Sequence, residues 1–248
     1  MSSTNKVILV TGSNTGIGYD LVHLLAAKGH TVYLASRKEA AGTEAVAKIK
    51  KEKNLDVKFV QLDVTDPASV AAAAAKIEKE EGRLNVLVNN AGISEMDKMT
   101  PISSPRIDSV RATFETNVVG LIQTTTAFLP LLQASHTAEA PSVIVNVSTD
   151  MASNTHMAGP KGFLHEAVPY NTSKAAANSY TIALAHSLKD VGIKVNAVTP
   201  GFTSTKLNGF APGGKTAEQG AAVIAEWALL GREGKTGQFA YDGGEFPW

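Results

Sequence analysis

The sequence of 248 residues contains no cysteine, and its charged residues balance to a formal net charge of zero. The absence of cysteine excludes disulfide bonds and thiolate chemistry. A balanced charge provides no basic surface of the kind that binds nucleic acid or an anionic membrane. Neither class of partner is expected.

Long apolar runs are also scarce. The first twelve residues, MSSTNKVILVTG, hold one lysine and an apolar stretch too short for the core of a signal peptide. No segment is expected to reach transmembrane length, because a transmembrane helix needs about 20 mostly apolar residues. The sequence therefore predicts a soluble, cytoplasmic protein. Hydrophobic residues still make up 44% of the chain, enough for a sizeable core.

Short β-branched runs alternate with longer helical patterns from end to end. The runs are apolar on both faces, which is typical of strands buried in a parallel sheet. They are Lys6–Thr11, Thr31–Ala35, Val57–Leu62, Val86–Val88, Val143–Val147 and Val195–Val198. This alternation predicts an α/β fold, a doubly wound parallel sheet in three α/β/α layers. No linker divides the chain, so residues 1–248 are expected to form one domain.

Several helix boundaries follow from capping residues. Asp66 and Pro67 suit the N-cap and first position of a helix. Apolar residues at near-helical spacing predict another helix from Val110 to Leu132. The segment Thr216–Gln219 has the form of a capping box, with Gly231 as the expected stop of that helix.

A glycine-rich turn, TGSNTGIG at residues 11–18, joins the first expected strand to the first helix. Glycines allow a tight turn and let backbone amides approach a pyrophosphate, while the positive end of the next helix favours the anion. The gaps between the glycines differ from those of GxGxxG. The position of the turn in an α/β chain nevertheless favours a dinucleotide site over a purely structural turn.

A tyrosine and a lysine lie one helical turn apart in VPYNTSK, residues 168–174. Pro169 suits a helix start, so Tyr170 and Lys174 are expected on one helix face. A free tyrosine has a pKa of about 10, and a neighbouring ammonium is expected to lower the pKa of the phenol. Tyr170 would then donate a proton to a carbonyl oxygen or remove one from an alcohol. The alternative is a packed tyrosine beside a surface lysine.

Five motifs in this order resemble the short-chain dehydrogenase/reductase family, and most closely its single-domain carbonyl reductases. They are TGSNTGIG, NNAG at 89–92, NVVG at 117–120, Tyr170 with Lys174, and Pro200-Gly201. The resemblance covers nearly the whole chain and implies a Rossmann-like fold and a nicotinamide cofactor. It also implies that Asn117 holds a water linking Lys174 to solvent; an exposed asparagine is the alternative.

The resemblance further implies which residues bind the cofactor. In the first half of the chain they are Gly12, Asn14, Thr15, Gly16, Ile17, Gly18, Ser36, Arg37, Lys38, Asp63, Val64, Asn90, Ala91 and Gly92. Later in the chain they are Tyr170, Lys174, Pro200, Gly201, Thr203 and Thr205. A turn aspartate is the alternative for Asp63, and an ordinary turn is the alternative for Pro200-Gly201.

The end of the second expected strand bears on the choice of nicotinamide cofactor. It has the sequence Ala35-Ser36-Arg37-Lys38, with no acid to bind the adenosine ribose of NAD. A basic residue there pairs with the 2′-phosphate of NADP. NADP(H) is therefore expected. NAD(H) stays possible because Thr15 stands where NADP-preferring relatives often have a second basic residue, and the two cations could also be solvated charges.

A second hydroxyl is expected to hold the carbonyl oxygen as charge develops. In the family it is usually a serine that closes the fifth strand. Here that strand ends Asn146-Val147-Ser148-Thr149, and counting from Asn146 places Thr149 in the catalytic position. Threonine keeps the hydroxyl but has fewer rotamers. Ser148 remains the alternative.

The segment Met151–Ala167 is longer than usual for the family. Its two histidines, His156 and His165, lack a flanking carboxylate pair, so no metal site is expected. The segment is expected to cover the substrate pocket or to alter a subunit contact. Candidate apolar walls of that pocket are Ile93, Met96, Met99, Met151, Phe163, Phe202, Leu207 and Phe210.

These observations together predict an NADP(H)-dependent reductase of small, fairly apolar ketones or aldehydes, with Asn117, Thr149, Tyr170 and Lys174 as its catalytic residues. Two alternatives remain: an NAD-dependent secondary alcohol dehydrogenase, and a catalytically silent dinucleotide-sensing module. The expected partner is a small carbonyl or alcohol substrate. The sequence leaves monomer, dimer and tetramer open.

Overall fold

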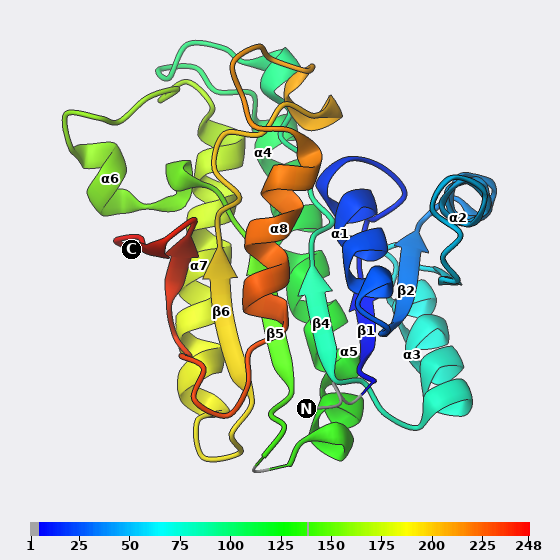
Figure 1. Cartoon of the computed structure of the whole chain (residues 1–248). Helices are drawn as coiled ribbons and strands as arrows, with labels where there is room; N and C mark the ends of the chain where they lie inside the picture. The colour runs from blue at the N-terminus through cyan, green and yellow to red at the C-terminus, as the bar shows by residue number, and fades with distance from the viewer. Residues whose placement is uncertain (1–4, 138) are drawn as a thin grey trace.

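The computed structural model describes residues 5–137 and 139–248. One eight-stranded sheet lies at its centre, in the order β3-β2-β1-β4-β5-β6-β7-β8 (Figure 1). The pairs from β3 to β7 are parallel, and β8 pairs with β7 in the antiparallel sense. The strands are β1 Val7–Val10, β2 Thr31–Ser36, β3 Lys58–Gln61, β4 Val86–Asn89, β5 Val143–Val147, β6 Lys194–Val198, β7 Phe239–Tyr241 and β8 Gly244–Glu245.

The predicted doubly wound sheet is confirmed, and each of the six expected strands lies within one residue of its expected bounds. The strands β7 and β8 were not expected. They have three and two residues, too few for a side-chain pattern to distinguish a strand from a turn.

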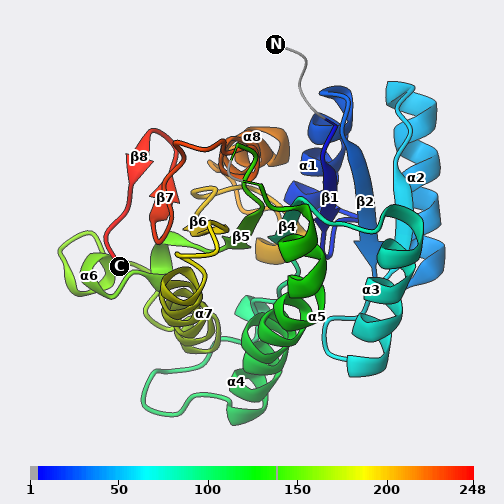
Figure 2. The ribbon, with the colours of Figure 1, turned by 90° about the horizontal axis from the view of Figure 1, so that it is seen from below.

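Helices cover both faces of the sheet (Figure 2). They are α1 Gly16–Ala27, α2 Glu39–Lys53, α3 Pro67–Glu81, α4 Ile107–Phe114, α5 Gly120–Ser135, α6 Asn154–Ala158, α7 Val168–Ser187 and α8 Ala217–Ala228. Strand β1 shows how the two cores form, because its side chains alternate between faces. Ile8 and Val10 pack with α1, α2 and α8, while Val7 and Leu9 pack with α3, α5 and α7.

The expected helix starts are present, but one expected stop is wrong. Asp66 caps α3 by accepting a hydrogen bond from the Ala68 amide at 2.9 Å, and Thr216 forms a capping box with Gln219. Helix α8 ends at Ala228, before Gly231. The amide of the next residue, Leu229, bonds back to a helix carbonyl, so the helix closes without a left-handed glycine.

Helices α4 and α5 are joined through a π-turn, Glu115–Val119, into one continuous helix over Ile107–Ser135. By length and composition alone, with 29 residues and a mean hydropathy of 1.3, this helix could cross a membrane. The expectation that no segment reaches that length is therefore wrong, because the π-turn extends the helix instead of ending it. Core helices meet the same criterion, and α5 packs Phe128, Leu131 and Leu132 into the sheet.

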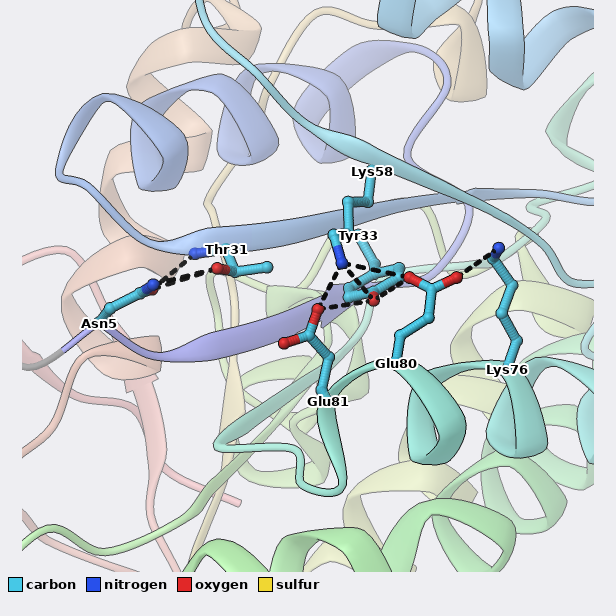
Figure 3. A network of polar contacts seen from close by, with 7 residues as sticks. All are labelled: Asn5, Thr31, Tyr33, Lys58, Lys76, Glu80 and Glu81. Atoms are coloured by element: carbon cyan, nitrogen blue, oxygen red, sulfur yellow. Dashed lines mark hydrogen bonds and ion pairs between the residues drawn. The ribbon is translucent and has the colours of Figure 1, made fainter.

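A polar network joins β2, β3 and the end of α3 (Figure 3). The buried Tyr33 hydroxyl lies 2.6 Å from Glu80 Oε2 and 2.9 Å from Glu81 Oε1. Lys58 Nζ donates to both carboxylates, and Lys76 pairs with Glu80. Burial, together with the hydrogen bonds to these carboxylates, raises the pKa of the Tyr33 phenol. The network ties a helix end to two strands at the side of the sheet.

The long segment Met151–Ala167 is attached to the C-terminal residues. Its helix α6 begins beside the chain end, where the Thr155 amide donates to the Trp248 carbonyl at 3.1 Å. The His156 ring lies between Phe246, at 5.1 Å, and Phe163, at 6.2 Å, between ring centroids. The Trp248 ring in turn stacks on Phe239 of β7. The segment is thereby fixed to the β7 side of the sheet.

The strand order reverses between β1 and its neighbour β4. In open α/β sheets such a switch point leaves a crevice beyond the carboxyl ends of the strands. The glycine-rich turn follows β1, residues 89–92 follow β4, and Thr149 follows β5. The predicted site residues therefore meet at one edge of the sheet.

Candidate active site

The three glycines of the turn after β1 are required by its geometry. Gly12 and Gly16 have φ angles of 58° and 60°, in the left-handed region that favours glycine. A Cβ on Gly12 would lie 2.8 Å from the Ala91 Cα, and a Cβ on Gly18 would lie 2.5 Å from the side-chain nitrogen Nδ2 of Asn90. The turn is thus packed directly against the residues that follow β4.

Asn90 and Thr11 hold these two segments together. The Asn90 side-chain amide donates to the carbonyls of Thr11 and Gly12 at 2.8 and 3.0 Å. In return, the Thr11 hydroxyl oxygen accepts from the amides of Asn90 and Ala91. The Asn90 side chain therefore supports the turn from within the protein, a structural role that accompanies the cofactor contact expected for it.

The start of α1 is suited to an anion. Thr15 is the N-cap residue, but its side chain makes no capping hydrogen bond, and the first turn contains no acidic residue. The backbone amides of this first turn therefore receive no hydrogen bond acceptor from a capping side chain. They lie at the positive end of the helix dipole. The same arrangement binds pyrophosphate in dinucleotide folds. Asn14, Gly16 and Ile17 are only half-buried, which leaves this turn accessible.

The ends of β2 and β3 lie beside the glycine turn. Ser36 is buried, and its hydroxyl bonds the backbone of Lys38, whereas Arg37 and Lys38 are exposed and form no ion pair among the described residues. One carboxylate oxygen of Asp63 accepts from the amide and hydroxyl of Thr65, as a turn aspartate does.

Val64, which was also expected to bind the cofactor, is buried against the start of α5. A Cβ on Gly120 would lie 2.9 Å from the Val64 side chain, and the Val64 carbonyl accepts from Gln123. Val64 therefore helps to dock α5 beside the end of β3.

Tyr170 and Lys174 lie in the first two turns of α7, as predicted, with Pro169 at the helix start. Both side chains are buried. Lys174 Nζ donates to the Val147 carbonyl at 2.7 Å and lies 5.9 Å from the centre of the Tyr170 ring. Val147 is the last residue of β5, so the lysine links the tyrosine helix to the strand end that leads to Thr149.

The expected lowering of the Tyr170 pKa is not present in this structure. Burial raises the pKa of the Tyr170 phenol, and the Asp150 carboxylate raises it further. Burial also lowers the pKa of Lys174 to about 8. The physical reason is desolvation, which penalises the charged form of both groups. The raised pKa of Tyr170 favours the neutral phenol, which is the form that donates a proton.

Asn117 is the central residue of the π-turn and is buried, so the alternative of an exposed asparagine is wrong. Its amide donates to the Ile93 carbonyl and the Ser173 hydroxyl, and its Oδ1 accepts from the Ile93 amide. Gly92 leaves room for this arrangement, because a Cβ there would lie 3.1 Å from Asn117 Oδ1 and 3.5 Å from Lys174 Nζ. π-turns inside helices are frequent at functional sites.

The two hydroxyls that follow β5 differ in their surroundings. The Ser148 hydroxyl is buried and bonds Asn178 Oδ1 of α7 at 2.7 Å. Thr149 is half-buried, and its hydroxyl has no hydrogen bond to the described residues. The hydroxyl that is free to meet a ligand is therefore that of Thr149.

The turn after β6 closes the site from the other side. Gly201 has a φ of 74°, and the buried Thr203 donates to its carbonyl at 3.1 Å. Thr205 caps a short 3-10 turn, Lys206–Asn208, and lies 3.8 Å from the position of a Cβ on Gly16. The buried Pro200 begins this turn. The segments after β1 and β6, far apart in the chain, thus face each other.

The predicted apolar walls fall into two groups. Met99, Phe163, Phe202, Leu207 and Phe210 are exposed, Phe210 to 67%. Ile93 and Met96 are half-buried, and Met151 is buried. Exposed large side chains of this kind are candidates to contact an apolar ligand.

Sequence reasoning missed Asp150 and Thr199. Thr199 donates to Asp150 Oδ1 at 2.5 Å and accepts from the Gly201 amide at 3.1 Å. Adjacency to Thr149 is the one signal in the sequence that could have drawn attention to Asp150. The pairing with Thr199, 49 residues away, appears only in the fold.

Comparison with known proteins agrees with this arrangement. The family model for short chain dehydrogenase matches residues 6–213. Salutaridine reductase from Papaver somniferum is 30% identical, covering 96% of this chain and 94% of its own, and (+)-neomenthol dehydrogenase from Capsicum annuum is 29% identical, covering 97% and 96%. The structure of NADPH-bound carbonyl reductase from chicken fatty liver superposes with a TM-score of 0.84 at 27% identity, covering 98% and 99%. Since the family model matches most of the chain and the glycine turn, Asn117, Tyr170 and Lys174 meet at one edge of the sheet, this protein belongs to the short-chain dehydrogenase family.

Proposed function

We propose that this chain, acting as one domain over residues 1–248, is an NADP(H)-dependent carbonyl reductase. It would reduce a small, fairly apolar ketone or aldehyde to an alcohol. The observation that supports this most is the position of Lys174, whose buried ammonium lies between the Tyr170 ring, the end of β5 and the Asn117 turn. Burying a cation costs free energy, so a lysine that served only the stability of the fold would not be expected at this position.

The nicotinamide cofactor, when bound, supplies the hydride. The chain supplies everything else. Tyr170, held neutral by burial, donates its phenolic proton to the carbonyl oxygen. The Thr149 hydroxyl donates a hydrogen bond to the same oxygen as negative charge develops. Lys174 then returns a proton to Tyr170, and a water held by Asn117 would link Lys174 to solvent, which resupplies that proton.

Two observations support a dinucleotide cofactor. The first is the start of α1, with its glycines and uncapped amides. The second is that a structural neighbour of this chain, the chicken carbonyl reductase, was solved with NADPH bound. Arg37 follows β2, is exposed and forms no ion pair with the residues that the structure describes; it favours NADP, because it could pair with a 2′-phosphate.

The substrate proposal depends on the exposed apolar side chains beyond the carboxyl edge of the sheet. They come from three separate segments, the loop after β4, the long segment before α7 and the loop after β6. Each segment also holds one non-glycine residue with a positive φ: Glu95, Leu164 and Phe210. Backbone strain of this kind clusters at ligand sites.

The test is turnover of NADPH with a panel of apolar ketones and aldehydes, followed by absorbance. Tyr170→Phe should lower kcat by at least about 100-fold, while NADPH affinity measured by fluorescence stays unchanged. Tyr180→Phe, on the same helix, is the matched control and should keep wild-type activity. An active Tyr170→Phe variant would overturn the mechanism. Tight NADPH binding without turnover of any compound would instead identify a sensing module, and oxidation of alcohols with NAD alone would identify the dehydrogenase.

A further inference from the structure

Asp150 connects two parts of the site that are otherwise separate. It directly follows Thr149 and begins the 3-10 turn Asp150–Ala152. Its carboxylate accepts a short hydrogen bond, 2.5 Å, from the Thr199 hydroxyl. The same Thr199 oxygen accepts from the Gly201 amide at 3.1 Å. A continuous chain of two hydrogen bonds therefore runs from the end of β5 to the turn after β6.

This connection is well protected from solvent on one side. Thr199 is 1% exposed, while Asp150 is half-buried. Hydrogen bonds to a charged acceptor are stronger than those between neutral groups. The carboxylate therefore fixes the turn of Pro200 and Gly201, which the proposed function places against the cofactor, more firmly than a neutral residue would.

Asp150 also places a negative charge near Tyr170, and it raises the pKa of that phenol beyond the effect of burial. Helix α7 packs against α4, the π-turn, β5, β6 and the turn at Asp150. The other charged or titratable groups on or beside these elements are Lys174 and His186 within α7 and Arg106, Asp108, Arg111, Glu115, His165, Glu166, Lys189, Asp190 and Lys194. Lys194 lies at the start of β6, the end of the strand away from the site. The other charged residues that lie outside α7 are all exposed. Of these groups, Asp150 is the one whose charge raises the Tyr170 pKa.

We propose that Asp150 is a positioning residue of this active site, which holds the Pro200-Gly201 turn in place through the Thr199 hydroxyl. This inference rests on the proposed function, because a positioning residue matters only if the site binds a cofactor and a substrate. Its two physical effects, on the turn and on the phenol, exist in the chain without turnover and can be measured without it.

The charge effect is tested by 19F NMR on chain carrying 3,5-difluorotyrosine at position 170, whose fluorines lower the phenol pKa into an accessible range. Asp150→Asn should lower the titration midpoint by about one pH unit, the size expected for removal of one neighbouring charge. Asp150→Glu, which restores the charge, should stay close to wild type. A midpoint for Asp150→Asn equal to that of wild type would overturn the charge effect.

The tether is tested by NADPH binding with a variant that keeps the charge. Thr199→Val removes the bridging hydroxyl and should weaken NADPH binding about fivefold, the loss of roughly one hydrogen bond, while the 19F midpoint is unchanged. Unaltered NADPH affinity in folded Thr199→Val, checked by circular dichroism, would overturn the tether. Failure of the proposed function looks different, since wild type itself would then turn over no carbonyl compound while these two measurements still held.

Discussion

At the scale of single residues, the site is organised by which polar groups already have partners. Ser148 and Thr149 are adjacent hydroxyls on the same strand end, yet the first bonds Asn178 and the second bonds no described residue. A hydroxyl that is committed to a buried amide cannot also bind a substrate oxygen without leaving that amide unpaired. We therefore propose that Thr149 takes the catalytic position that a serine usually holds in the family.

We predict that Thr149→Ala lowers kcat for ketone reduction by about 100-fold, because one donor to the developing oxyanion is lost. Ser148→Ala is the matched control. It should keep kcat within a few fold and instead lower the melting temperature, since Asn178 loses its buried partner. Steady-state kinetics and thermal unfolding distinguish the two. The reverse pattern would move the catalytic hydroxyl to Ser148.

The same reasoning applies to Arg37, a cation at the end of β2 with no partner among the described residues. Arg37→Asp should weaken NADPH binding by at least about tenfold, because a favourable pair with the 2′-phosphate becomes a repulsion. NADH binding should be unchanged or tighter. Lys51→Asp, on the exposed end of α2, makes the same charge change as a control. NADPH affinity that is indifferent to Arg37 would contradict the cofactor assignment.

At the scale of secondary-structure elements, one irregularity in a helix positions Asn117, a proposed site residue. The π-turn Glu115–Val119 lies between α4 and α5. It turns Asn117 inward, where the side chain bonds Ile93 and Ser173. Asparagine is unfavourable inside a regular helix because its amide competes for backbone partners. In the π-turn the Asn117 side-chain amide instead forms hydrogen bonds with the backbone of Ile93, in the loop after β4.

The network around Tyr33 stabilises how β2, β3 and α3 fit together (Figure 3). Tyr33→Phe should destabilise the fold by about 1 kcal/mol, because Glu80 and Glu81 lose a donor but keep Lys58 and Lys76. Urea unfolding at pH 7 measures this. Turnover should be unaffected, since the network lies away from the carboxyl edge of the sheet. A stability equal to wild type would show that the lysines and solvent fully satisfy both carboxylates.

At the scale of the whole molecule, the site lowers the stability of the fold that holds it. Lys174 is a buried cation whose pKa falls from 10.5 to about 8 because burial disfavours its charged form. Between these two pH values the unfolded chain binds more protons than the folded one, so this group makes stability rise with pH there. Below pH 8 its full cost is present.

We therefore predict that Lys174→Met is more stable than wild type below pH 8, by on the order of 3 kcal/mol, and that the advantage shrinks as pH rises through 8 toward 10. Activity should be lost. Lys189→Met, an exposed lysine after the same helix, should show no pH-dependent gain. Urea unfolding across this pH range provides the measurement. A wild type that is the more stable protein at pH 7 would mean that the bond from Lys174 to Val147 outweighs the cost of burial.

Much of this architecture was predictable because its signals are local. Apolar runs located the strands to within one residue, and the spacing of Tyr170 and Lys174 placed both on one helix face. Two expectations failed where neighbours outweighed the local signal. Leu229 closed α8 before Gly231 could, and burial raised the Tyr170 pKa that a nearby lysine alone would lower.

The sequence by itself determined the order of strands and helices, the glycine turn and the residue types of the site, because these depend on side-chain periodicity and on residues a few positions apart. Only the tertiary structure decided which hydroxyl is free, that Asn117 faces inward and that Asp150 meets Thr199 across 49 residues. These outcomes depend on burial and on partners from distant segments, and both exist only once the sheet has brought β4, β5 and β6 together.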